Sequence, residues 1–356
     1  MSKTRPIALP AGDVTVAWEP SLDEAAWSDL AARVPPCLRF MAHGWWQAWG
    51  ETMLPYDRWR GPLRLAVARD GRGVAQAALP VARQMMLSLP VLSLAGNYKP
   101  FRSWLIAEDA PGETAAGLVD FFAGEAGAKA LRLGPMKSDM AETRLLLDAF
   151  RAAGWRFCRI GQGTEFLLDV PATFDAYKAI VGTKKFQRIR YKKNRLSREG
   201  VVRVERFRGA QLEAWRRAIA DAAKVEQASW LGRLGGDPNY ADPRMASMWQ
   251  RYFGHEQASA ASSIWILYLD DRPISFNATL DSGDCRFLMA LAYDEGFKGF
   301  SPGKIVALDS IVSAFDDGIR TFNMGQGATG YKAEWGADRE EHLEDWLVLP
   351  PTPSGR

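Results

Sequence analysis

The chain has 356 residues, of which 47% are hydrophobic, and a formal net charge of +3 at pH 7. This length allows two ordinary domains with real cores, and the small net charge excludes a protein that binds polyanions over its whole surface. Three separated cysteines without a C-x-x-C pair exclude a disulfide framework and a zinc knuckle. Because no secretory signal follows Met1 and no apolar run could span a membrane, we expect a cytoplasmic protein and leave contact with the inner membrane surface open.

Hydrophobic periodicity and turn residues divide the first 160 residues into short elements. Asp70-Gly71 lies between two apolar runs, which indicates a hairpin, and Pro35-Pro36 ends the first helix. Trp45, Trp46 and Trp49 in the second helix suit core packing. The predicted elements are a strand at 14–18, helices at 21–34 and 40–53, a hairpin at 63–81, a strand at 91–94, a helix at 112–128, a strand at 131–133, a helix at 138–153 and a strand at 155–160.

The second half is predicted to follow a similar order of elements. Gly182 is expected to interrupt its first, long helix. The predicted elements are a strand at 165–170, a helix at 174–199, a strand at 201–207, a helix at 210–229, a polar loop at 232–243, a helix at 244–260, a hairpin at 264–280, a strand at 285–293, a glycine-rich loop at 294–303, a helix at 304–315 and strands at 321–324 and 342–349.

The halves therefore look like two copies of one plan. Four pairs of elements correspond: hairpins 63–81 and 264–280, strands 91–94 and 285–293, helices 112–128 and 304–315, and strands 131–133 and 321–324. After the third strand the second copy is rich in glycine, whereas 96–104 in the first copy has a single glycine. We expect two domains, 1–160 and 161–356, and a cofactor in the second only.

The glycine-rich loop and the start of the following helix form a candidate anion site. Gly299 and Gly303 allow close approach of the backbone, Ser301 can cap the helix, Pro302 suits the first turn, and Lys304 adds positive charge. Unpaired N–H groups and the helix dipole favour a phosphate at such an N-terminus. The loop is neither a Rossmann fingerprint nor a P-loop, since G-x-G-x-x-G and G-x-x-x-x-G-K-[ST] are both absent.

The Ser301-Pro302-Gly303 turn, followed by Tyr331-Lys332-x-x-Trp335, resembles the GNAT-fold acetyltransferase-like proteins associated with cellulose biosynthesis. These are related to the Fem-type aminoacyltransferases, which carry two GNAT-like domains in tandem. The resemblance implies an α/β (α+β) fold in which each domain is a mixed, mostly antiparallel sheet flanked by helices. It also implies acyl-CoA as co-substrate, with the pantetheine arm in a gap beside the central strand and the pyrophosphate near Lys304. The usual GNAT pyrophosphate signature is not intact here, and the Fem relatives use aminoacyl-tRNA.

Residues 184–198 carry eight basic side chains and no acidic one. Helical spacing places Lys184, Arg188, Lys192 and Arg195 on one face. Like charges along a helix repel each other, and an anionic partner would relieve that repulsion. The candidates are CoA phosphates, an anionic membrane surface, a sugar-nucleotide diphosphate or tRNA. A solvated charged face is the alternative.

Acyl transfer by direct attack needs help for proton transfer and for the oxyanion, and no Ser or Cys nucleophile. Tyr331 is a candidate to protonate the leaving thiolate, and Lys332 to bind the donor or stabilise negative charge. Glu226, His255 and Glu334 are candidate bases. No cluster of His, Cys, Asp or Glu has metal-ligand spacing, so we expect no metal.

These observations favour an acyl-CoA-dependent N-acyltransferase acting on an amine of a cell-envelope precursor, either a sugar or polysaccharide amine or a lipid amine with a long-chain donor. One alternative is a Fem-like transferase that uses aminoacyl-tRNA, and another is a non-catalytic GNAT-fold binding protein. The expected partners are a small-molecule or lipid acceptor and an anionic membrane surface, with nucleic acid expected only as tRNA in the Fem-like case.

Overall fold

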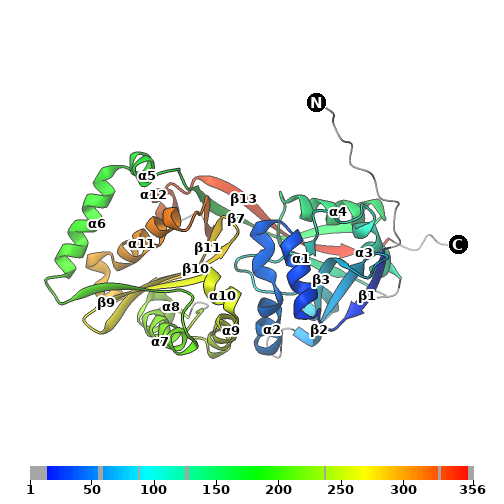
Figure 1. Cartoon of the computed structure of the whole chain (residues 1–356), viewed down its shortest axis with the longest axis horizontal. Coiled ribbons are helices and arrows are strands. Elements are labelled where there is room, and N and C mark those ends of the chain that lie inside the picture. The colour runs from blue at the N-terminus through cyan, green and yellow to red at the C-terminus, as the bar shows by residue number, and fades with distance from the viewer. Residues whose placement is uncertain are drawn as a thin grey trace.

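The computed structural model describes residues 14–54, 59–86, 89–124, 128–235, 238–327 and 330–351. Within them the strands join one mixed sheet of thirteen strands, with helices on both faces (Figure 1). The first half comprises β1 (Thr15–Glu19), α1 (Glu24–Arg33), the 3-10 helix η1 (Pro36–Met41), α2 (His43–Thr52), β2 (Trp59–Arg69), β3 (Ala75–Met86), β4 (Leu89–Leu94), β5 (Leu105–Ile106), α3 (Thr114–Ala123), β6 (Leu131–Lys137) and α4 (Ala141–Ala152).

The strand β7 (Arg156–Asp169) leads into the second half. That half comprises α5 (Phe174–Val181), α6 (Thr183–Leu196), β8 (Val202–Phe207), α7 (Leu212–Ala228), α8 (Trp230–Leu234), α9 (Pro243–Phe253), α10 (Glu256–Ala261), β9 (Ser262–Leu269), β10 (Arg272–Ser282), β11 (Cys285–Tyr293), the 3-10 helix η2 (Glu295–Phe300), α11 (Pro302–Asp316), β12 (Thr321–Gln326), α12 (Gly330–Glu334) and β13 (Arg339–Leu349).

The strand order confirms the predicted duplication. In the first half β3 pairs antiparallel with β4, which pairs parallel with β6. In the second half β10 pairs antiparallel with β11, which pairs parallel with β12. The final strands are exchanged between the halves, because β13 from the C-terminal end pairs with β6, whereas β7 pairs with β12. β7 and β13 also pair with each other, so the sheet is continuous.

Two strands predicted at 155–160 and 165–170 are one fourteen-residue strand, β7. The prediction was wrong because pairing with β13 from Arg156 to Leu167 keeps this segment extended through the interval between the two predicted strands. The predicted boundary between residues 160 and 161 falls inside this strand. The division into domains 1–160 and 161–356 stays a prediction.

Helix breaks follow local backbone chemistry. The expected break at Gly182 is confirmed, since this residue has φ 83° and separates α5 from α6. The helix predicted at 40–53 is instead η1 and α2, and that predicted at 244–260 is α9 and α10 with an interruption at Gly254 and His255. Short helices also occupy segments expected to be loops, namely α8 and η2.

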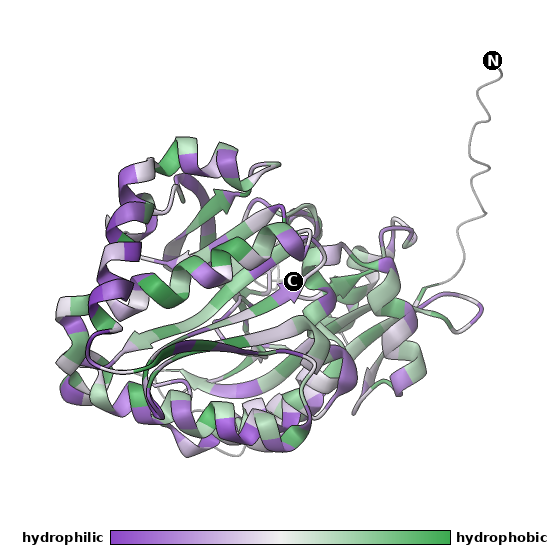
Figure 2. Ribbon diagram, turned by 60° about the vertical axis from the view of Figure 1, so that its left-hand side comes forward, coloured by the Kyte–Doolittle hydropathy of each residue, from purple (hydrophilic) through white to green (hydrophobic). Residues whose placement is uncertain are grey.

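Aromatic side chains of α2 and α9 join the two halves. Trp45 contacts Trp249 and Tyr252 edge to face, with ring centroids 6.2 and 5.3 Å apart. Trp45, Trp46 and Trp49 are buried, which confirms their predicted packing role. Figure 2 shows hydrophobic residues concentrated along the sheet and hydrophilic residues on the outer surfaces of the helices. Among the described helices, none combines the length and apolar character that crossing a membrane requires.

Candidate active site

The parallel strands β11 and β12 pair over three residues only, from Cys285↔Thr321 to Phe287↔Asn323. Beyond Asn323 the chain of β12 turns away, with Gly325 at φ 77°. The Asn323 side chain holds this turn, since its Oδ1 accepts the N–H of Gly325 at 2.7 Å and its Nδ2 donates to Glu165 at 2.7 Å. The two strands therefore separate into a fork, as the resemblance implied.

This fork opens into a cleft of about 850 Å³. Its walls are mostly apolar side chains and backbone of the two diverging strands, closed at one side by α12 and at another by a loop of the first half. The lining residues are Tyr98, Lys99, Trp230, Leu288, Met289, Ala290, Leu291, Ala292, Tyr293, Lys298, Ser301, Gly303, Lys304, Met324, Gly325, Gln326, Tyr331 and Lys332. A flexible, largely apolar arm fits such a cleft.

The N-terminus of α11 forms the outer end of the cleft. The helix begins at Pro302, and Ser301 precedes it with φ 54° but makes no capping bond through its side chain. A Cβ at Gly303 would lie 3.2 Å from Cδ1 of Tyr293, so glycine permits the close packing of helix and strand here. Of the five residues predicted to bind the cofactor, Ser301, Gly303 and Lys304 line the cleft, whereas Gly299 and Pro302 do not.

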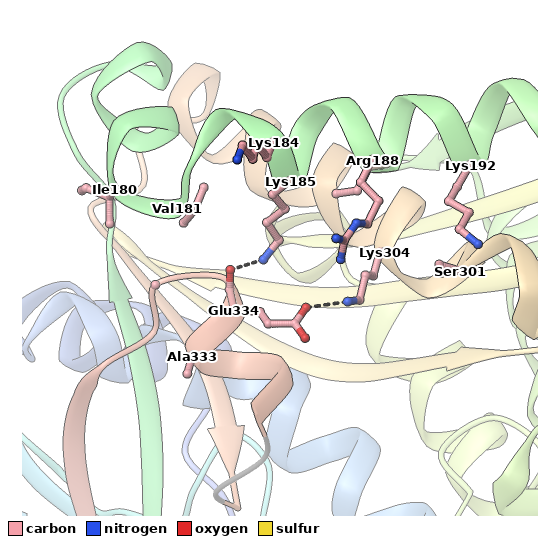
Figure 3. A pocket seen from close by; sticks show the side chains of 12 residues that line it. Ile180, Val181, Lys184, Lys185, Arg188, Lys192, Ser301, Lys304, Ala333 and Glu334 are labelled. Atoms are coloured by element: carbon pink, nitrogen blue, oxygen red, sulfur yellow. Dashed lines mark hydrogen bonds and ion pairs between the residues drawn. The ribbon is translucent and has the colours of Figure 1, made fainter.

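A second pocket of about 800 Å³ lies between α6 and the same helix N-terminus, as Figure 3 shows. Its cationic residues are Lys184, Lys185, Arg188, Lys192 and Lys304. Its one carboxylate among the lining residues is Glu334. Ser301 and Lys304 line both the pocket and the cleft, so the two spaces meet at the start of α11. We call the second space the basic pocket.

The cations of the basic pocket interact with one carboxylate, that of Glu334, and with backbone carbonyls among the described residues. Lys304 Nζ lies 2.5 Å from a carboxylate oxygen of Glu334, and Lys185 donates to the backbone carbonyl of Glu334 (Figure 3). The pKa of Lys185 is lowered to about 8, mainly by burial and also by nearby Lys304, against the opposing effect of Glu334. Lys192 Nζ donates to the carbonyl of Gly299 at 2.6 Å. An incoming anion would relieve this crowding of positive charge.

The three predicted anion contacts of α6 separate in the structure. Arg188 and Lys192 line the basic pocket, together with Lys184. Arg195 does not line it, because its guanidinium stacks 5.3 Å from the ring centroid of Phe300.

Tyr331 and Lys332 both line the cleft, so the structure brings these two predicted residues together with the α11 terminus. Lys332 is 6% exposed, and its Nζ donates to the carbonyls of Gly325, at 2.5 Å, and Gln326. The pKa of Lys332 is lowered to about 8, mainly by burial and also by nearby Lys99, against the opposing effect of Glu165. Burial raises the pKa of the Tyr331 phenol, which keeps it protonated and able to donate.

The structure does not bring the predicted bases into the cleft. Glu226 is buried, and its two oxygens accept backbone N–H groups of Asn239, Tyr240 and Ala241 at 2.7 to 3.0 Å. Three such bonds anchor the loop after α8, so Glu226 has a structural role that its place at a helix end could not reveal.

His255 and Glu334 lie elsewhere as well. His255 lines a separate cavity of about 380 Å³ with His43, whose ring centroid is 6.3 Å away. Glu334 lies in the basic pocket, where its carboxylate pairs with Lys304. Neither residue lines the cleft.

Several residues of the site were not singled out from the sequence. Tyr98 and Lys99 come from the first half, in the loop that lacks the glycines of its counterpart. Trp230 comes from α8. Lys185 belongs to the predicted basic run but was not assigned to the anion site.

Comparison with known proteins agrees with this geometry. Residues 183–333 match the model of the GNAT acetyltransferase domain, and no curated protein sequence is significantly similar to the chain. FemX has a TM-score of 0.63 at 11% identity, over 94% of this chain and 97% of that one. A tandem GNAT protein from the clavulanic acid biosynthesis pathway has a TM-score of 0.50 at 13% identity, over 96% and 100% of the chains.

L-PGS from Bacillus licheniformis also has a TM-score of 0.50 at 13% identity, over 93% of each chain. At such identities the likeness shows the fold and leaves the reaction open. The association with cellulose biosynthesis stays a prediction. Residues 183–333 therefore match the GNAT acetyltransferase domain, and the chain as a whole shares the fold of FemX and of a tandem GNAT protein.

Proposed function

We propose that the protein is an acyl-CoA-dependent N-acyltransferase. The observation that carries the proposal is the meeting of a cationic pocket and an apolar cleft at one helix N-terminus, where Ser301 and Lys304 line both. A donor with a phosphate-rich nucleotide at one end and an apolar thioester arm at the other matches this division. The phosphates would lie against Lys304, Lys185 and Arg188, and the arm between β11 and β12.

In the proposed reaction the acceptor amine attacks the thioester carbonyl, a C–N bond forms and the C–S bond breaks. The Lys332 ammonium, at the fork, stabilises the negative charge that develops on the carbonyl oxygen. Tyr331 donates its phenolic proton to the leaving thiolate. The proton of the amine is released to water, since neither Glu226 nor His255 lines the cleft.

We propose an amine of a cell-envelope precursor as acceptor, either a sugar amine or a lipid amine at an anionic membrane surface. The lipid variant is supported by two exposed apolar side chains on α8, Trp230 at 47% and Leu234 at 78%, the first of which also lines the cleft. Lys298 at the same rim adds positive charge.

A Fem-like transfer from aminoacyl-tRNA is the second candidate. It is favoured by the fold likeness to FemX and by the basic run of α6. Binding to tRNA would weaken steeply as salt is raised, whereas binding of one CoA molecule would weaken modestly. A non-catalytic binding role would leave CoA bound without turnover on any amine.

The test is the thermal shift of the protein with CoA, acetyl-CoA and a long-chain acyl-CoA. A ligand at 100 times its Kd should add about 2.7 kcal/mol and raise Tm by several degrees. Lys304→Met should weaken the binding of every CoA species about tenfold, because it removes a charge-assisted contact, and should therefore roughly halve the stabilisation at the same ligand concentration. Lys129→Met, an exposed charge change in the first half, should leave the response unchanged.

The relative shifts for acetyl-CoA and the long-chain donor would separate small-acyl from lipid chemistry. If no CoA species raises Tm, the donor assignment is wrong, and binding of aminoacyl-tRNA becomes the next measurement.

A further inference from the structure

A chain of hydrogen bonds runs behind the fork and ends on the Lys332 ammonium. It begins where β12 leaves the sheet, since Asn323 is the last residue of β12 that pairs with β11 and it also pairs with β7. Beyond Asn323 the register between β12 and β7 shifts, and pairing resumes at Gln326, opposite Glu165. The chain at 324–325 therefore bulges out of the sheet, and both of its residues line the cleft.

Gly325 joins the two ends of this chain of hydrogen bonds. Its N–H donates to Oδ1 of Asn323 at 2.7 Å, and its carbonyl accepts a hydrogen bond from Nζ of Lys332 at 2.5 Å. The Asn323 amide nitrogen donates in turn to Oε2 of Glu165 at 2.7 Å. The position of Lys332 thus depends on Glu165, a residue that does not line the cleft.

Glu165 is held from the side of the first half. It is 2% exposed, and Lys137 of β6 lies 3.5 Å from the same oxygen that Asn323 bonds. Lys137 also pairs with Glu341 of β13 at 2.6 Å. Burial and these two donors leave the Glu165 carboxylate little freedom to move, so it is a fixed anchor for the Asn323 amide.

We infer that Glu165 and Asn323 are positioning residues of the transfer, which hold the Lys332 ammonium at the fork through the backbone of Gly325. This rests on the proposed function, in which that ammonium stabilises the negative charge on the thioester oxygen. Such stabilisation needs a donor that is already in place when the charge develops, and a misplacement of about 1 Å is costly.

Glu165 also acts on the charge of Lys332. Among the described residues, the charged groups that act on Lys332 are Glu165 and Lys99. Lys137 and Glu341 in turn act on Glu165. The Glu165 carboxylate favours the ammonium form, and so opposes the lowering of the pKa of Lys332 by burial and by Lys99. Loss of that carboxylate should therefore lower the pKa of Lys332 further.

The first test measures the titration of Lys332 directly, without donor or acceptor. Trace acetic anhydride acetylates unprotonated amines at each pH, and the remaining lysines are then blocked with a heavy acetyl label in denaturant. Trypsin cuts after Arg320 and Arg339, which gives a peptide with Lys332 as its single lysine. Glu165→Gln removes the charge but keeps an oxygen that can accept from Asn323, so the labelling curve should move to lower pH.

Asn323→Ala should move the labelling curve of Lys332 to higher pH, because it keeps the Glu165 carboxylate and releases the ammonium toward water. Glu226→Gln is the matched control, since it changes an equally buried carboxylate whose bonds hold a loop elsewhere, and it should leave the curve in place. A curve that Glu165→Gln or Asn323→Ala leaves in place, or that Glu226→Gln moves as far, would overturn the inference.

The second test separates positioning from folding in the reaction itself. Asn323→Ala should lower kcat about tenfold and change the KM of acyl-CoA by less than about twofold, because the donor binds elsewhere in the cleft. The double variant Glu165→Gln with Asn323→Asp exchanges donor and acceptor, so Gly325 again has an acceptor for its N–H. It should restore kcat to within about threefold of the wild type.

A purely structural role of Asn323 would lower Tm, leave kcat per folded molecule unchanged and give no rescue in the double variant, which would contradict the inference. If no acyl-CoA is turned over, the proposed function fails, and the labelling curves of Lys332 still decide the inference.

Discussion

The two halves of the sheet differ most at the same topological place, after their third strand. In the second half β11 and β12 diverge and leave the cleft. In the first half the chain after β4 is fastened to β6 by Arg102, which is 4% exposed and donates to the carbonyls of Gly96, at 2.8 Å, and Gly134, at 3.1 Å. The backbone N–H of Arg102 also donates to Pro135. One copy thus closes this place with its own side chain, and the other has a cleft there.

The comparison shows that the two copies of the plan have different structural roles. The first copy fills its fork and sends its loop across to the second copy, where Tyr98 and Lys99 form part of the cleft wall. Between the halves the exchanged strands bring Lys137 of β6 beside Glu341 of β13, at 2.6 Å, and Glu165 of β7, at 3.5 Å. Three predictions concern these different roles, in order of expected effect.

Lys137→Met should cause the largest loss of stability, about 3–5 kcal/mol, because it leaves two carboxylates without their buried cation. Urea unfolding of the variant and the wild type at several pH values measures this difference in the free energy of unfolding. Burial already raises the pKa of Glu165, and Lys137 opposes that rise. Without Lys137 the Glu165 carboxyl group should bind its proton still more tightly in the folded state than in the unfolded state. The stability of the variant should therefore fall as pH rises from the ordinary glutamate pKa through the raised one.

The wild type should show a smaller fall over the same interval, since Lys137 is present. A stability loss that is equal at all pH values would contradict the assignment of Lys137 as the partner of Glu165. Lys129→Met should change stability by less than about 0.5 kcal/mol.

Arg102→Ala should cost about 3 kcal/mol, because two buried carbonyls lose their donor and the guanidinium leaves a gap. It should not create a second CoA site, so the variant should bind the same number of acyl-CoA molecules per chain as the wild type. Calorimetric stoichiometry checks this. Two bound CoA molecules per chain would contradict the view that the first copy lacks the remaining parts of a donor site.

Glu334→Gln should strengthen anion binding by about two- to fivefold at low salt. Glu334 is half exposed and pairs with Lys304, and an exposed pair contributes about 0.2–1 kcal/mol. Removing its charge frees Lys304 for a phosphate. Calorimetry with CoA and with inorganic pyrophosphate measures the change, which should shrink at high salt. Glu213→Gln on α7, an exposed partner of Arg216, is the control; weaker binding by Glu334→Gln would contradict the model.

Much of this fold could be predicted from the sequence because its signals are local. Gly182 breaks a helix, Asp70-Gly71 makes a turn, and Ser301-Pro302-Gly303 starts α11 at the mouth of the cleft. The repeated order of elements also follows from periodicity along the chain. These features depend on neighbouring residues, which a single sequence contains.

The features that sequence reasoning missed depend on distant partners. β7 reads as two strands until β13, far along the chain, is known to pair with it. Glu226 has the residue type of a base, and only the folded loop at 239–241 shows that its oxygens are already occupied. Lys99 lies almost 200 residues from the strand whose carbonyl it contacts. Spacing along the chain carries no information about such contacts.

The most direct test of the central claim is a structure of the protein with a non-hydrolysable thioether analogue of a long-chain acyl-CoA. We predict that the diphosphate lies against the N-terminus of α11 beside Lys304, with the arm between β11 and β12 and the thioether sulfur near Tyr331. An analogue bound in the cavity lined by His43 and His255, or lying only on the outer face of α6, would contradict the account.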